Sequence, residues 1–215
     1  EMWGHETGGD VESVAISSDG SYIAAGSWDG KVYLFERGSA TPLWSHETFG
    51  GVYSVAISSD GSYIAAGSWD DDRVYLFERG SATPLWSHET GGNIFSVAIS
   101  SDGKYIAAGS IDNKAYLFER GSATPLWSHG TDGEVRSVAI SSDGSYIAAG
   151  SWDDRVYLFE RGSATPLWSH ETGGNVESVA ISSDGGFITA GSWDGKVYAF
   201  FSEHILERTR SQRLL

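Results

Sequence analysis

The octapeptide SVAISSDG (13–20) decides the fold, because it returns at Ser54, Ser96, Ser137 and Ser178. The intervals between successive copies are 41, 42, 41 and 41 residues. A longer block, YLFERGSATPLWSH, occurs four times without change, at 33–46, 75–88, 116–129 and 157–170. Self-similarity at a fixed period of about 40 residues is the signature of a repeat architecture.

Each period has the pattern of short β-strands. Val14 and Ile16 alternate with small residues, which is strand periodicity, and Ser18-Asp19-Gly20 is a tight-turn sequence. A second strand is expected at 22–27, a third at 32–35 and a fourth at 43–46, separated by Asp-Gly and GSATP connections. Four short strands in about 41 residues is the spacing of a propeller blade.

The two ends of the chain are out of phase with the blade. Residues 2–5 (MWGH) align with the fourth strand, and 196–200 align with the third. We therefore predict an all-β, five-bladed β-propeller over 1–200, in which the N-terminal strand closes the C-terminal blade and removes the open edge. Residues 201–215 leave the repeat and form a tail, either helical or disordered. This closure favours a monomer over a dimer in which two chains exchange the fourth strand.

The repeat resembles that of WD-repeat propellers, on the stretch SVAISSDGSYIAAGSWDGKVYLFE (13–36). The family's usual Trp-Asp ending is Phe-Glu here, and its Gly-His dipeptide is missing. The fourth strand, PLWSHETGG (42–50 with Phe49 in place of Gly), is instead similar to that of quinoprotein-like propellers. The resemblance implies that one aspartate in each blade holds a structural turn. These aspartates are Asp29, Asp70, Asp112, Asp153 and Asp194.

Composition and charge exclude several classes of protein. The 215 residues include no Cys, which rules out disulfides, thiol nucleophiles and Cys zinc sites. The formal net charge of -15 should repel phosphate backbones, so nucleic acid is not an expected partner. No apolar run has the ~18–20 residues of a membrane helix, so no membrane association is expected. The opening residues do not resemble a signal peptide, which favours a cytoplasmic location.

Catalysis and metal binding are not expected. One His recurs in each period, at His5, His46, His88, His129 and His170, so the imidazoles are too widely spread to ligate one ion. Every reactive residue type is copied from blade to blade, whereas an enzyme needs one unique site. We therefore predict no catalytic residue, no metal site and no cofactor.

Two columns of the repeat vary while the rest is nearly constant. One lies just before SVAISSDG, and the other is in the turn between the second and third strands. Both connections emerge on the same end of an antiparallel blade, so the variation gathers on one face of the disk. Its aromatic and arginine side chains are types enriched at binding hot spots. The candidate binding residues are Glu12, Tyr53, Phe95, Arg136, Glu177, Trp28, Trp69, Ile111, Trp152 and Trp193.

These observations favour a non-enzymatic binding or scaffold module that engages a protein or peptide through the variable face. The acidic field would attract a basic partner. Two alternatives remain open at this point. One is a multivalent carbohydrate-binding lectin with near-equivalent pockets between blades. The other is a recently amplified or engineered propeller with no selected ligand.

Overall fold

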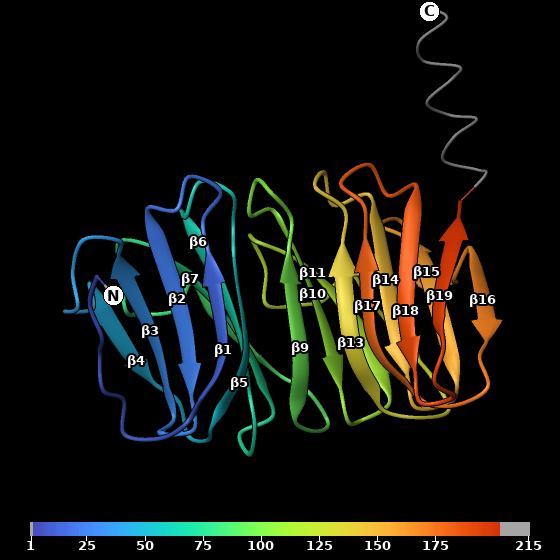
Figure 1. The fold of residues 1–215 in the computed structure, drawn as a ribbon, viewed down its shortest axis with the longest axis horizontal. Helices are drawn as coiled ribbons and strands as arrows, with labels where there is room; N and C mark the ends of the chain where they lie inside the picture. Colours follow the sequence, from blue (N-terminus) through green and yellow to red (C-terminus); the bar gives the residue numbers. More distant parts are fainter. Residues whose placement is uncertain (1, 203–215) are drawn as a thin grey trace, which may run out of the picture.

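The structure, a computed structural model, describes residues 2–202 and arranges them in five antiparallel sheets, the blades of a β-propeller (Figure 1). Blade 1 contains β1 (Val11–Ile16), β2 (Tyr22–Ser27), β3 (Lys31–Glu36) and β4 (Trp44–Glu47). Blade 2 contains β5 (Val52–Ile57), β6 (Tyr63–Ser68), β7 (Arg73–Glu78) and β8 (Trp86–Glu89). Blade 3 contains β9 (Ile94–Ile99), β10 (Tyr105–Ser110), β11 (Lys114–Glu119) and β12 (Trp127–Gly130). Blade 4 contains β13 (Val135–Ile140), β14 (Tyr146–Ser151), β15 (Arg155–Glu160) and β16 (Trp168–Glu171). Blade 5 contains β17 (Val176–Ile181), β18 (Phe187–Ser192) and β19 (Val197–Phe201).

The prediction of an all-β fold of five antiparallel blades is confirmed. The first strand of each repeat lies innermost, and the second, third and fourth pair outward in order. No helix occurs among residues 2–202, and therefore none that is long and apolar enough to cross a membrane. β19 runs one residue past the expected end of the propeller, to Phe201. The rest of the predicted tail, 203–215, lies outside the described residues.

The middle strands are buried on both faces because each blade is covered by its neighbours. In β3 the four residues from Val32 to Phe35 are all buried, and the matching residues of β7, β11 and β15 are too. The small residues of β2 allow this stacking. A Cβ atom added to Gly26 would lie 2.6 Å from Cγ1 of Val52 in the next blade. Glycine therefore lets adjacent sheets approach closely.

Hydrogen bonds also join each blade to the next. The Ser18 N–H donates to the Ser59 carbonyl at 2.9 Å, and the Val55 N–H donates to the Ser13 hydroxyl at 3.0 Å. From the fourth strand, the Trp44 indole N–H donates to the carbonyl of Arg79 at 2.7 Å. Equivalent bonds recur at the following interfaces, so the propeller is built from one interface used repeatedly.

One expected aspartate is in a different place. Asp71, and not Asp70, accepts the hydroxyl hydrogen bond of Tyr75, as Asp29 does from Tyr33. The extra residue of blade 2 is therefore Asp70, which precedes the turn aspartate and adopts a φ of 70°. Asp72 follows the turn aspartate with a φ of 56°, as Gly30, Asn113, Asp154 and Gly195 do with positive φ in the other blades. The other four predicted aspartates occupy the expected position, each accepting from the Tyr of the following strand.

The prediction that the N-terminal strand closes the C-terminal blade is wrong in this structure. Blade 5 has three strands, and no other strand of residues 2–202 pairs with β19. The blades form an arc, with the N-terminus beside blade 1 at one end of Figure 1 and β19 at the other. Residues 2–9 lie against blade 1 instead, where the Trp3 indole N–H donates to the Arg37 carbonyl at 2.6 Å. The expectation of a monomer depended on that closure and loses its basis.

Candidate functional site

The two variable columns meet on one edge of the arc. The column that precedes SVAISSDG lies near the start of each innermost strand, as Glu12 does in β1. The tryptophan column comes directly after the next strand of the blade, as Trp28 does after β2. The start of β1 and the end of β2 share this edge, which faces the bottom of Figure 1. The structure therefore brings together side chains that lie about 41 residues apart in the sequence.

Four aromatic side chains from the first three blades form a continuous row. The ring centroids of Trp28 and Trp69 are 5.9 Å apart, and Tyr53 lies 5.5 Å from Trp69. Phe95 follows, 5.0 Å from Trp69 and 5.5 Å from Tyr53. These distances are typical of aromatic pairs that stabilise one another beyond the burial of their area.

Arg136 continues the row into the last two blades. Its guanidinium carbon lies 3.4 Å from the centroid of Phe95 and 4.0 Å from that of Trp152. The same guanidinium pairs with Glu134 at 3.1 Å and Glu177 at 3.8 Å. Trp193 ends the row, 5.2 Å from Trp152. We call Trp28, Tyr53, Trp69, Phe95, Arg136, Trp152 and Trp193 the aromatic belt.

A tryptophan–glutamate pair lies in each half of the belt. The Trp152 indole N–H donates to Glu177 at 2.9 Å, and the Trp28 indole N–H donates to Glu12 at 2.5 Å. Arg136 covers the first pair, whereas Trp28 and Glu12 are both exposed to solvent. Ile111 stands in the tryptophan column of blade 3, and Phe95 is buried, so these two contribute packing more than open surface.

The turns that carry the belt are held by the Tyr–Asp bonds beneath them. Asp29 accepts from the Tyr33 hydroxyl at 2.6 Å, from the Gly8 N–H at 2.8 Å and from the Lys31 N–H at 3.0 Å. Burial raises the pKa of Asp29, but these hydrogen bonds outweigh it and hold the pKa below its ordinary value. Burial and the Asp29 carboxylate raise the pKa of Tyr33 to about 12. The tyrosine therefore remains a donor at neutral pH.

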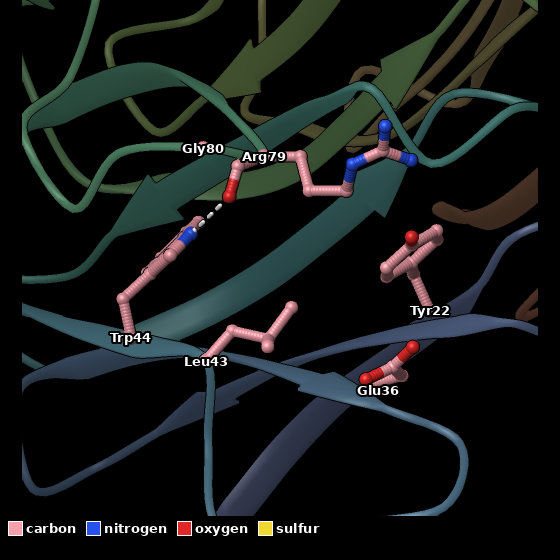
Figure 2. Close-up of a pocket in the computed structure, with 6 residues that line it drawn as sticks. All are labelled: Tyr22, Glu36, Leu43, Trp44, Arg79 and Gly80. Atoms are coloured by element: carbon pink, nitrogen blue, oxygen red, sulfur yellow. Dashed lines mark hydrogen bonds between the residues drawn. The ribbon is translucent and has the colours of Figure 1, made fainter.

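The opposite edge carries a groove between blades 1 and 2 of about 340 Å³ (Figure 2). Its lining residues are Tyr22, Glu36, Leu43, Trp44, Arg79 and Gly80. The Arg79 guanidinium lies 4.4 Å from the centroid of Tyr22, and its carbonyl takes the Trp44 N–H. Similar stacks join Arg120 to Tyr63 and Arg161 to Tyr105. These stacks were not predicted from the sequence, although the arginine in every unchanged ERGS stretch was the signal.

A second hollow lies along the inner side of the arc. It has a volume of about 390 Å³ and is lined by Ala, Val and Ile of all five innermost strands. Its walls are apolar and nearly the same in each blade. They therefore offer no group that could orient one particular ligand.

The histidines lie between blades and not in a common site. His46 packs edge-on against Phe77 of the next blade, with centroids 5.0 Å apart, and His88 does the same with Phe118 at 5.1 Å. Burial lowers the pKa of His88, which favours the neutral ring. Within residues 2–202 no group of three or more His, Asp or Glu side chains is placed to hold a metal ion.

Comparison with known proteins agrees with the fold. The WD40 family (WD domain, G-beta repeat) matches five times, at residues 1–36, 40–78, 82–119, 123–160 and 164–200. No curated protein matches the sequence of this chain. The five matches cover most of the chain, and each corresponds to one period of the repeat. Together with the five antiparallel blades, they show that the chain belongs to the WD40 repeat family.

Proposed function

We propose that this chain is a non-enzymatic binding module that holds a basic protein or peptide segment across the aromatic belt. WD40 repeats commonly mediate protein interaction or scaffolding and are typically non-enzymatic. The belt lies on the edge of the propeller where the repeat varies most, whereas SVAISSDG and the block YLFERGSATPLWSH are nearly constant. A scaffold that stays fixed while one edge changes is the arrangement of a binding surface.

The contacts of Arg136 are the main observation that favours a basic ligand. This side chain shows how the belt receives a cation: two aromatic rings lie against the guanidinium, and two glutamates neutralise it. Such cation–π contacts contribute about 0.5–2 kcal/mol each. The exposed Trp28–Glu12 pair offers the same two groups to a lysine or arginine of a partner. The net charge of -15 adds long-range attraction for a basic segment.

Selection from a random-peptide display library tests this function. We expect selected peptides to be enriched in Lys, Arg and aromatic residues. The double variant Tyr53→Ala/Trp69→Ala should lower their affinity at least tenfold, because it removes two central rings of the belt. The control is Leu85→Ala, an exposed residue remote from the belt, which should leave affinity unchanged. Peptides without basic enrichment, or full affinity in the double variant, would refute the assignment.

A further inference from the structure

The two ends of the arc expose valines whose counterparts in the internal blades are buried. On the blade 1 end, Val14 is 68% exposed, whereas its counterpart Val55 is 6% exposed. On the blade 5 end, Val197 is 82% exposed, whereas its counterpart Val156 is fully buried. We call the first surface, made of Val11, Val14 and Ile16, the leading face. The second, made of Phe187, Trp193, Val197 and Phe201, is the trailing face.

The contact between blades 4 and 5 shows which groups pack against each of these faces when a neighbouring blade is present. A Cβ atom added to Gly150 would lie 2.6 Å from Val176 of the next blade. The Val179 N–H donates to the Ser137 hydroxyl at 3.0 Å, and the Ser142 N–H to the Ser183 carbonyl at 3.0 Å. The trailing side of a blade thus supplies a glycine and a serine hydroxyl, and the leading side supplies two valines.

The exposed ends carry both halves of this contact. Gly191 on the trailing side matches Gly150, but an added Cβ there has no heavy atom of residues 2–202 within 4 Å. Ser178 in blade 5 is the counterpart of Ser137 in blade 4. On the leading face, Val11 and Val14 are the counterparts of Val176 and Val179. Placed together, the two faces form one more copy of the interface already used between all neighbouring blades.

The fourth strand that blade 5 lacks within residues 2–202 has its counterpart at the other end of the arc. Residues 2–9 lie on blade 1 as a fourth strand lies on the following blade: Trp3 bonds Arg37 as Trp44 bonds Arg79, and the Gly8 N–H donates to Asp29. Among residues 2–202, no third strand pairs with this segment and no fourth strand pairs with β19. In blades 2 and 4 the register pairs Arg73 with Glu89 and Arg155 with Glu171. Continued across the ends, it pairs Lys196 with Glu6.

We infer that a second copy of this chain docks head to tail on the first. Its residues 2–9 complete blade 5, and its leading face covers the trailing face. The chain's own N-terminal segment is at the far end of the arc from β19, so it does not fill this place (Figure 1). The aromatic belt continues across the junction, because Trp193 meets Glu12 of the second copy as Trp152 meets Glu177. A heterologous contact of this kind closes into a ring when the rotations match.

A disulfide trap in this cysteine-free chain tests the register. The variant Glu6→Cys/Lys196→Cys should oxidise to a disulfide-linked dimer or larger head-to-tail product on a non-reducing gel. The matched control is Lys31→Cys/Glu47→Cys, the same strand pair inside blade 1, which should form a bond within one chain. A 6–196 bond within one chain, or no bond where the control forms one, would overturn the proposal.

Light scattering of the cysteine-free protein gives an independent readout. The expected mass is at least twice the 23.1 kDa of one chain. Gly191→Val should weaken association at least tenfold, because its side chain has room in one copy but would meet Val11 of the next. Gly121→Val, also at an open glycine but in a loop of blade 3, should associate normally. A monomeric parent protein, or normal association of Gly191→Val, contradicts the docking.

Discussion

Asp19 holds the turn that repeats in every blade. Its carboxylate accepts from the hydroxyls of Ser17 and Ser21, both at 2.7 Å, and from the Ser21 N–H at 2.9 Å. The Ser17 hydroxyl in turn accepts from the Tyr22 N–H at 3.0 Å, and Gly20 supplies the positive φ of 70°. One side chain thus fixes the geometry that joins β1 to β2. The full set recurs at Asp60 and Asp143. Asp102 and Asp184 keep the bonds from the preceding serine hydroxyl and the following N–H.

These bonds make the contribution of Asp19 depend on pH. The Ser17 and Ser21 hydroxyls, with the Ser21 N–H, lower the pKa of Asp19 from 3.8 to about 2. A pKa depressed in the folded state stabilises that state above the unfolded value, and the benefit is lost as pH falls through the folded value. The parent protein should therefore unfold at a higher temperature than Asp19→Asn at pH 7, and the gap should close between pH 3.8 and about 2. Thermal unfolding followed by circular dichroism measures it, and a constant gap down to pH 2 would contradict it.

At single positions the sequence alone was a good but incomplete guide. It predicted the turn aspartates, because the Asp-containing turn is present in every copy of the repeat. It chose Asp70 where the structure uses Asp71, since an added residue can be absorbed on either side of a turn. Similarly, the sequence placed Arg136 in a variable column, but it did not predict the position of its guanidinium between Phe95 and Trp152. Such contacts cross blades and leave no local pattern.

At the scale of strands and turns, glycine sets how closely one blade approaches the next. Gly61 has φ of 70°, and an added Cβ would lie 2.5 Å from the Tyr22 ring of the previous blade. Gly61→Ala should therefore lower the free energy of unfolding by about 1–3 kcal/mol, through left-handed backbone strain and displacement of that ring. Urea unfolding measures the change. Gly80→Ala, where nothing lies within 4 Å, should stay within about 0.5 kcal/mol of the parent. Equal losses in both variants would show that the inter-blade contact is not the cause.

Strand order and strand position were predictable because each blade repeats the same local signals. Alternating residues, Asp-Gly turns and small residues facing large ones recur in phase, so an error in one copy is corrected by the others. The two variable columns were found in the same way, by their departure from the repeat. Their assembly into one belt follows from the antiparallel order of the strands, which places both columns on the same edge.

Closure of the ring belongs to the whole molecule and could not be predicted from the repeat. Each blade interface uses the same residues whether the ring contains few blades or many. The small rotation between neighbours, which accumulates along the arc, decides whether the ends meet. In the structure the two ends do not meet, and Val14 and Val197 are therefore exposed to solvent. A repeat that specifies the interface therefore leaves the number of blades in the ring open.

The charge of the whole molecule gives the head-to-tail association a distinctive salt dependence. Each copy carries a net charge of -15, so two copies repel at long range, whereas their contact faces are mainly apolar. Raising the salt from about 10 mM to about 150 mM shortens the screening length from ~30 Å to ~8 Å and weakens that repulsion. Self-association should therefore tighten severalfold, as measured by light scattering over a dilution series. Binding of a basic peptide to the belt should weaken over the same range, because salt screens an attraction there. Self-association that weakens with salt would instead show that ion pairs such as Lys196 with Glu6, and not the apolar faces, provide most of the binding free energy.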